Sequence, residues 1–254
     1  AENLRSMLES DFSKRVNPVQ TYFRKLPPAT GTQAIDDLAA TVTVRNARHW
    51  SEYLTKWLVG VVANAMNDLG CQNHVCLVLT GEQGKFKTTW LDNLCPRALA
   101  SYLFTGKIDP QNKDVLTLVA EYLFINIDDQ LRALNKRDEN ELKNLITAPS
   151  VKYRRPYDVY IEEYPHLASF MASVNGNDFL TDPTGSRRFL PFEVLSIDID
   201  RAIWVDMDQV YAESRTLLNN GFRYWFDDTE IEELHRGNVA FHVQTIEYEM
   251  LLKG

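Results

Sequence analysis

Residues 74–89 read HVCLVLTGEQGKFKTT. The first half of this stretch is an apolar run, which is typical of a buried strand, and the second half is a turn with two glycines that ends in Lys-Thr. Together they predict a strand followed by a phosphate-binding loop. In such a loop, backbone N–H groups surround a polyphosphate, the lysine reaches the outer phosphates and the next hydroxyl holds Mg²⁺. The residues expected to bind nucleotide are Gly81, Glu82, Gln83, Gly84, Lys85, Phe86, Lys87, Thr88 and Thr89, and Thr88 is also an expected metal ligand.

The match to the pattern G-x-x-x-x-G-K followed by Ser or Thr is imperfect, because Phe86 stands in the place of the second glycine. A strand, turn and helix without any ligand could produce the same fragment. The assignment therefore depends on the motifs farther along the chain.

A second apolar run, YLFINI at residues 122–127, ends in Asp128 and Asp129. A carboxylate at the carboxyl end of a buried parallel strand can hold Mg²⁺, and a second one can orient or deprotonate an attacking water. We therefore expect a Walker B strand with Asp128 on the metal and Asp129 on the water. The alternative is that both carboxylates merely end a strand and cap the following helix.

A third apolar run, residues 168–174, ends in Asn175 and is followed by Arg187 and Arg188. An Asn at a strand end is by itself a turn former. A planar, permanently charged arginine can neutralise charge on phosphates in a transition state, commonly from a neighbouring subunit. The two arginines could instead pair with local carboxylates such as Asp178 or Asp182.

The segment VNGNDFLTDPTGSRRFLP at residues 174–191 resembles the hallmark of the virulence-associated protein E family. Residues 126–129, NIDD, stand where such proteins tend to show E-L-D-E, and residues 207–214, MDQVYAES, resemble the D-Q-L-W-A-E-A helix. The resemblance covers roughly residues 45 to 250. Phe86, in place of glycine, and Asp129, in place of the more usual glutamate, depart from the family pattern.

Members of this family are P-loop ATPases of phages, plasmids and genomic islands, related to superfamily 3 and poxvirus-type primase-helicases. The resemblance implies an α/β fold of the P-loop NTPase type, similar to AAA+ proteins and superfamily 3 helicases. It also implies ATP with Mg²⁺, a homo-oligomeric ring such as a hexamer, and single-stranded or forked DNA as partner. Asn175 would then touch the γ-phosphate and the attacking water, with Arg187 or Arg188 acting across the subunit boundary.

A cluster of basic and aromatic residues lies between the acidic strand and the Asn175 strand, namely Lys152, Tyr153, Arg154, Arg155 and Tyr157, preceded by Lys143. Basic groups interleaved with rings can contact phosphates while the rings stack on bases. In superfamily 3 helicases this interval carries a hairpin that lines the central channel. The net charge of −8 argues against a surface that coats nucleic acid everywhere but permits such a local track. The alternative is a solvated loop whose arginines pair with Asp158, Glu162 or Glu163.

The composition is that of a soluble, cytoplasmic protein without membrane contact. The chain has 254 residues, of which 44% are hydrophobic, so that it can bury a substantial core. No run approaches the roughly 18 apolar residues that span a bilayer, and no signal-peptide pattern opens the chain. Three cysteines, an odd number without the paired spacing of a zinc site, favour a reducing compartment. Since the chain starts at Ala1 and its last helical pattern runs to Gly254, we expect a segment of a longer polypeptide.

The pattern of apolar runs divides the chain into three parts. We expect a helical N-terminal segment at residues 1–48, a P-loop ATPase core at 49–197 and a helical C-terminal subdomain at 198–254. Alternation of strand and helix patterns in the core predicts a mainly parallel sheet flanked by helices. The expected function is an ATP-hydrolysing, DNA-helicase-like domain of a mobile-element replication protein. A nucleotide-holding nucleic-acid-binding scaffold with little turnover and a monomeric P-loop phosphotransferase are the alternatives.

Overall fold

The computed structural model describes residues 16–155, 159–182 and 186–243. Several sequence predictions lie outside these described residues. They are the first 15 residues of the expected N-terminal helical segment, the residues Tyr157 and Asp158, and the end of the helical pattern up to Gly254.

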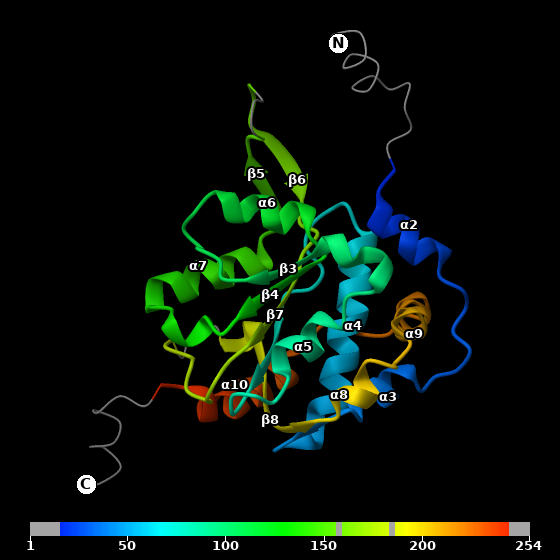
Figure 1. The fold of residues 1–254 in the computed structure, drawn as a ribbon. Helices are drawn as coiled ribbons and strands as arrows, with labels where there is room; N and C mark the ends of the chain where they lie inside the picture. Colours follow the sequence, from blue (N-terminus) through cyan, green and yellow to red (C-terminus); the bar gives the residue numbers. More distant parts are fainter. Residues whose placement is uncertain (1–15, 156–158, 183–185, 244–254) are drawn as a thin grey trace, which may run out of the picture.

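A six-stranded sheet in the order β1-β8-β2-β7-β4-β3 forms the centre of the molecule (Figure 1). Its strands are β1 (Val42–Val44), β2 (Cys76–Thr80), β3 (Leu103–Gly106), β4 (Phe124–Asp128), β7 (Ser169–Ser173) and β8 (Phe189–Ile197). All neighbours pair in parallel except β1, which runs antiparallel to β8. The expected mainly parallel sheet is therefore confirmed, and each expected strand lies within two residues of its predicted start.

Helices cover both faces of this sheet, as parallel strands joined by crossovers require. The α-helices are α2 (Pro18–Lys25), α3 (Ala34–Ala39), α4 (Trp50–Met66), α5 (Lys87–Asp92), α6 (Asp114–Glu121), α7 (Lys136–Thr147), α8 (Ile199–Ala202), α9 (Met207–Asn219) and α10 (Asp228–Asn238). Short 3-10 helices are η1 (Ala47–His49), η2 (Arg97–Tyr102), η3 (Leu131–Ala133), η4 (Ser186–Arg188) and η5 (Val239–Phe241). In Figure 1, α6 and α7 lie on one side of the sheet and α4 and α9 on the other.

Strand side chains point alternately to the two faces of the sheet, and the core is therefore divided into two apolar clusters. In β2, Leu77 and Leu79 pack with α4 and α9, whereas Cys76 and Val78 pack with α6 and α7. Because strand side chains alternate between faces, one fully buried strand contributes to both clusters. The apolar residues of α4 from Trp50 to Val62 recur at helical spacing and are buried, so that they form part of the core.

The N-terminal part of the chain differs from the expected helical segment at residues 1–48. It contains strand β1, in which Val42 pairs with Ile197 and Val44 pairs with Val194. Three residues are too few to give a recognisable alternation, and their partner strand lies about 150 residues away in sequence. Residues 42–44 of the expected N-terminal segment thus belong to the central sheet.

A separate antiparallel hairpin of β5 (Ser150–Tyr153) and β6 (Glu162–Pro165) projects from the body near α6 (Figure 1). It leads into β7 and therefore lies toward the amino ends of the parallel strands. Across the described parts of the chain, no helix combines the length and the apolar character that crossing a membrane requires.

Candidate functional site

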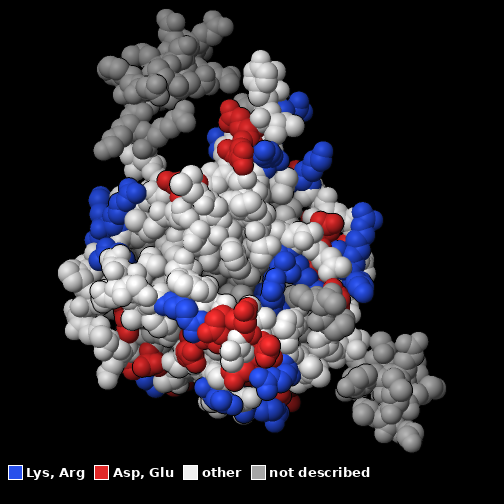
Figure 2. Space-filling view, turned by 180° about the vertical axis from the view of Figure 1, so that it is seen from behind, with Lys and Arg blue, Asp and Glu red and all other residues white. Residues whose placement is uncertain are grey.

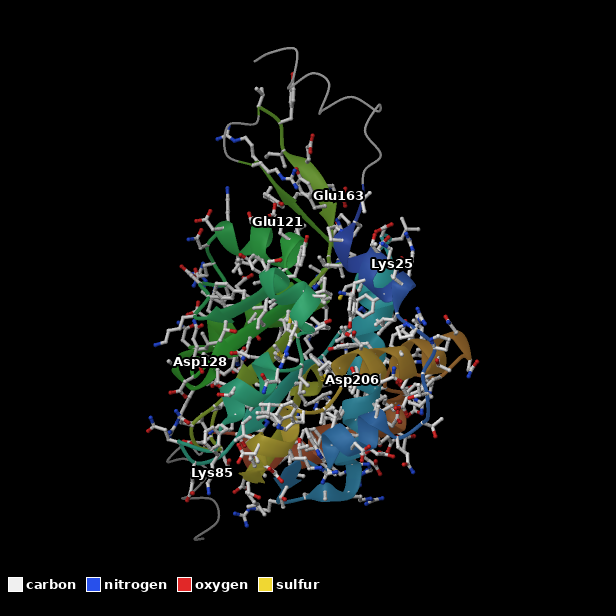
Figure 3. All side chains as sticks on the ribbon, turned by 45° about the vertical axis from the view of Figure 1, so that its right-hand side comes forward. Lys25, Lys85, Glu121, Asp128, Glu163 and Asp206 are labelled. Atoms are coloured by element: carbon white, nitrogen blue, oxygen red, sulfur yellow. The ribbon has the colours of Figure 1, made fainter. Side chains whose placement is uncertain are left out.

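Polar side chains gather where β2, β4 and β7 end. Asp128 is paired with Ser173, and Leu79 of β2 is paired with the same Ser173, so the carboxyl ends of the three strands meet at one edge. In open parallel sheets this edge is where ligands bind. Figure 3 shows Asp128 and Lys85 toward the same end of the molecule, whereas Glu121 of α6 and Glu163 of the hairpin strand β6 lie toward the opposite end.

The loop at residues 81–86 joins β2 to α5 through two left-handed glycines. Gly81 has φ +125°, and a Cβ on it would lie 2.8 Å from the carbonyl oxygen of Val194. Gly84 has φ +80° with open space around it. The Gly81 carbonyl also accepts a hydrogen bond from the Gly176 N–H at 3.0 Å, which ties the start of the loop to the turn after β7. A side chain at Gly81 would therefore separate the loop from β8.

Lys87 begins α5 and turns back under this loop. Its side chain is 5% exposed, and Nζ donates to the carbonyl oxygens of Gly81 at 3.1 Å and Glu82 at 2.6 Å. Nζ also donates to Oδ1 of Asn175 at 3.2 Å. Burial lowers the pKa of Lys87, and the charges of Asp129 and Asp128 oppose that shift only in part. A negatively charged ligand at the loop would stabilise this ammonium group.

Thr88, Asp128 and Ser173 form a triangle of oxygen atoms. Thr88 Oγ1 lies 2.8 Å from Asp128 Oδ1, Ser173 Oγ lies 2.8 Å from the same oxygen, and the two hydroxyls are 2.9 Å apart. Hydroxyl and carboxylate oxygens are ligands of the hard kind that Mg²⁺ prefers. The expected metal pair, Thr88 and Asp128, is thus brought into contact. Ser173 was not expected, although it stands at the end of the third apolar run.

Asp129 and Asn175 are held against each other. The backbone N–H of Asn175 donates to Asp129 Oδ1 at 3.0 Å, and its side-chain amide donates to Oδ2 at 2.8 Å. Asp129 has φ +46°, a left-handed conformation that few residues other than glycine adopt and that clusters at functional sites. The expected water-positioning carboxylate and the expected γ-phosphate contact therefore lie side by side, next to Lys87.

Phe86 precedes Lys87 and has φ +59° and ψ +20°, also left-handed. Its ring is 53% exposed, so packing against the body does not account for the residue. The backbone at this position thus has the conformation for which glycine is favoured, and Phe86 bears the associated strain.

The other expected loop residues are more exposed. Glu82 and Lys85 form an ion pair at 3.5 Å on the surface, and Gln83 is exposed. Thr89 lies on the exposed side of α5.

Arg187 and Arg188 lie at the opposite end of the sheet from Lys87, Thr88 and Asp128. Phe189 begins β8 and pairs with Cys76, the first residue of β2, so both arginines stand at the amino ends of the strands. The order of motifs along the chain does not reveal this, because β8 runs parallel to β2 and must be entered from the amino side.

Within the described residues the two arginines lack the carboxylate partners that the sequence suggested. Asp178 pairs with Arg132 at 2.9 Å, and Asp182 pairs with Lys143 at 3.3 Å. Burial, and then the charge of Arg187, lowers the pKa of Arg188, and its Nε is buried without a hydrogen-bond partner in the described part of the chain. Both line a cavity of about 190 Å³ together with Asn73, His74, Thr147, Tyr224 and Trp225.

The hairpin differs from the expected nucleic-acid track in one residue. Tyr153 is 7% exposed, its ring lies 4.5 Å from that of Tyr164, and its hydroxyl donates to Glu121. The expected base-stacking ring is therefore buried between the hairpin strands and α6. One exposed ring, that of Tyr160, lies instead just before β6, between the exposed apolar side chains of Val159 and Ile161.

The basic groups of the hairpin are partly paired. Lys152 lies 3.4 Å from Glu163, and Arg155 lies 3.5 Å from Glu121. Arg154 is exposed, with no ion pair among the residues the structure describes. In Figure 2 the projecting hairpin carries both colours of charge, and acidic and basic side chains form separate patches on the body.

Lys143, expected to precede this track, is buried between α7 and residue 182. Its Nζ lies 2.7 Å from Glu139 and 3.3 Å from Asp182, and it is 3% exposed. It therefore fastens α7 to residues 181–182 rather than facing nucleic acid.

Comparison with known proteins identifies relatives of this chain. The family model of the virulence-associated protein E-like domain matches residues 25–243. Among solved structures, the apo structure of the NrS-1 C-terminal region (305–718) superposes with a TM-score of 0.53 at 14% identity, covering 94% of this chain and 55% of that one. The A-form apo structure of the same region gives a TM-score of 0.49 at 13% identity, covering 92% and 53%. The curated proteins contain no match.

The first of these two matches, with a TM-score of 0.53, shows a common fold. The chain spans about half the length of the solved structures that it matches, 55% of the first and 53% of the second.

Proposed function

Because the chain belongs to the family of virulence-associated protein E-like domains, we propose that it is an ATP-hydrolysing, helicase-like domain of a mobile-element replication protein. One observation carries this proposal. Lys87, Thr88 and Asp128 meet at the carboxyl edge of the parallel strands, under a loop whose glycines Gly81 and Gly84 are left-handed. Binding of a polyphosphate with its metal ion requires a positively charged side chain, oxygen ligands for the metal and a glycine-containing loop at the start of a helix. All three are present here.

In this proposal residues 81–89 bind ATP, and Thr88 and Asp128 hold Mg²⁺. The oxygen set fits the ion, because both side chains offer hard oxygens within hydrogen-bond distance of each other. When bound, Mg²⁺ neutralises charge on the phosphates. Lys87 leaves the carbonyls of Gly81 and Glu82 to reach the outer phosphates, which offer a charged acceptor in their place.

Asp129 and Asn175 act on the water. The Asp129 carboxylate accepts two hydrogen bonds from Asn175, which fix its direction while further lone pairs stay available for a water proton. Asn175 Oδ1 already faces Lys87, so its amide group stands between the phosphate-binding lysine and the carboxylate. Placing a nucleophile in this way is most of what hydrolysis of a phosphoanhydride requires of a protein.

The proposed partners of this domain are DNA and a second copy of the chain. Arg187 and Arg188 stand at the amino ends of the strands, so they can serve only the site of a neighbouring copy that associates head to tail, as in a ring. The β5–β6 hairpin, at the same end of the strands, offers Arg154, Lys152 and Arg155 to the phosphates of single-stranded or forked DNA.

A nucleotide-holding scaffold with little turnover is a second candidate, because Phe86 holds a strained left-handed conformation within the loop. Phosphate release from ATP, measured with Mg²⁺ in the presence and absence of single-stranded DNA, tests the proposal. We expect hydrolysis that DNA accelerates. ATP and DNA binding without turnover would favour the scaffold, hydrolysis by a monomer indifferent to DNA would favour a phosphotransferase, and absence of ATP binding would refute all three.

A further inference from the structure

Arg132 connects the ends of two strands. It lies in η3, three residues after Asp129, and its Nη2 donates to Asp178 Oδ2 at 2.9 Å. Its Nη1 donates to the carbonyl oxygen of Asn175 at 3.4 Å. The guanidinium thus spans the turn at residues 175–178 that follows β7.

Gly176 lies directly beneath this guanidinium. It has φ +91°, and a Cβ on it would lie 3.1 Å from Arg132 Nη1 and 3.4 Å from Asp178 Oδ1. The N–H of Gly176 donates to the Gly81 carbonyl at 3.0 Å, and the Gly81 N–H faces the Gly176 carbonyl at 3.4 Å. The turn is therefore held by Arg132 on one side and by the 81–86 loop on the other.

The same turn carries the amide group that joins Lys87 to Asp129. Asn175 Oδ1 accepts from Lys87, and Asn175 Nδ2 donates to Asp129. A shift of the turn would break these contacts together, because one residue makes all of them.

We propose that Arg132 is a positioning residue, which holds the 175–178 turn so that the Asn175 side chain lies between Lys87 and Asp129. This inference rests on the proposed function, since it assigns a role in placing the groups that would meet phosphate and water. The planar fork of arginine suits the task, because it reaches a carbonyl and a carboxylate at once in a fixed geometry. A lysine at the same position could hold only one of the two acceptors in that plane.

The Arg132–Asp178 pair is exposed, with side chains 54% and 48% accessible. Exposed ion pairs add little to global stability. The effect of breaking this pair should accordingly appear in the geometry of the turn and leave the melting temperature nearly unchanged.

Two variants distinguish an effect of the position of the 175–178 turn from an effect of the charge of the site. Arg132→Gln and Asp178→Asn change the charge of the site in opposite directions but release the same turn. We expect both to lower kcat by between about tenfold and about a hundredfold, with little change in the Kd for ATP. Arg132→Lys should give an intermediate kcat. Arg201→Gln is the matched control, because Arg201 of α8 forms a similarly exposed pair with Asp37 of α3 at 3.6 Å, and both partners belong to helices that supply none of the site residues named above. Opposite effects of the two variants, or effects no larger than that of the control, would overturn the inference.

Amide hydrogen exchange provides a readout that does not need activity. The N–H of Asn175 donates to Asp129 and that of Gly176 donates to Gly81, so both report on the turn. Arg132→Gln should accelerate their exchange and Arg201→Gln should not. Should the unaltered chain neither bind nor hydrolyse ATP, the proposed function fails and this measurement alone decides the role of Arg132. Unchanged exchange overturns the inference, and so does faster exchange combined with unchanged kcat in an active enzyme.

Discussion

The ammonium nitrogen of Lys87 lies 3.2 Å from the side-chain oxygen of Asn175, although 88 residues separate them in sequence. This contact joins the start of α5 to the end of β7 across the edge of the sheet. The hydrogen bond therefore couples the position of Lys87, which is expected to bind phosphate, to that of Asn175, which is expected to contact the attacking water.

Lys87→Ala removes the buried ammonium group while leaving the apolar core untouched. We expect the fold to persist and the binding free energy for ATP to fall by about 1.5–3 kcal/mol, the usual contribution of hydrogen bonds to a charged group. Isothermal titration with Mg²⁺-ATP measures this loss. Lys107→Ala, which removes an exposed lysine from the loop after β3, serves as the control. Equal ATP affinity in both well-folded variants would contradict the phosphate-binding role of the 81–89 segment.

Phe86→Gly should relieve the backbone strain in the 81–86 loop. The left-handed conformation of Phe86 carries a penalty of roughly 1–2 kcal/mol, of which glycine's greater freedom in the unfolded chain offsets about 0.5–1 kcal/mol. We expect a small rise in melting temperature together with higher ATP affinity or turnover. If the variant instead loses both affinity and turnover, the exposed ring itself takes part in binding.

Arg187→Ala and Arg188→Ala should lower turnover far more than nucleotide affinity, by up to several powers of ten. The reason is their placement, because the five residues of β2, about 15 Å of strand, separate them from their own loop. We therefore also expect the rate per subunit to rise with protein concentration. Mixing either variant with Lys87→Ala should restore part of the activity. If the rate per subunit does not depend on protein concentration and no mixture of variants recovers activity, Arg187 and Arg188 do not act in the site of a neighbouring subunit.

Charge reversal in the hairpin at Lys152, Arg154 and Arg155 should abolish DNA binding and DNA-stimulated hydrolysis while basal hydrolysis persists. Among single changes, Arg154→Glu should weaken binding most, since Lys152 and Arg155 are engaged by Glu163 and Glu121. Fluorescence anisotropy across a salt series measures this, and loss of one phosphate contact should reduce the salt slope by about 1. Lys107→Glu is the control for net charge. Equal losses in the control and in Arg154→Glu would place the DNA contact elsewhere.

Stability should decline at mildly acidic pH because of His166. Burial lowers the pKa of this histidine from 6.5 to about 4, although both ring nitrogens face carbonyl oxygens of Ala148 and Ala168. Between these two pH values the unfolded chain binds a proton that the folded chain does not, so the free energy of unfolding falls as pH decreases through this window. The contribution is at most about 3 kcal/mol. Urea denaturation from pH 7 to pH 4 should show a shallower decline for His166→Gln than for the unaltered chain.

The sequence predicted those features that depend on short-range patterns. The three strands that end in Thr80, Asp128 and Ser173 have strong apolar runs, and their parallel arrangement follows from the helices between them. The contacts of Thr88 with Asp128 and of Asn175 with Asp129 then follow from strand ends meeting at one edge. The family resemblance, carried by residues 174–191, is confirmed by the match over residues 25–243.

Features that depend on tertiary packing were not predictable in this way. The burial of Tyr153 depends on α6, which supplies Glu121 as partner of its hydroxyl. The position of Arg187 and Arg188 depends on which end of the sheet β8 enters, and no local pattern encodes that end. Arg132 carries no motif of its own, and its approach to Gly176 and its hydrogen bonds to Asn175 and Asp178 arise only in the folded chain.

Strand β1 has a consequence for how this domain can be exchanged between proteins by recombination. Its three residues cover the outer edge of β8 at Val194, Ser196 and Ile197. A fragment inherited from residue 49 onward would carry an uncovered edge strand, whose free N–H and C=O groups invite pairing with other chains. The unit that can move intact into a new protein therefore begins before Val42, upstream of the point at which the nucleotide-binding pattern starts.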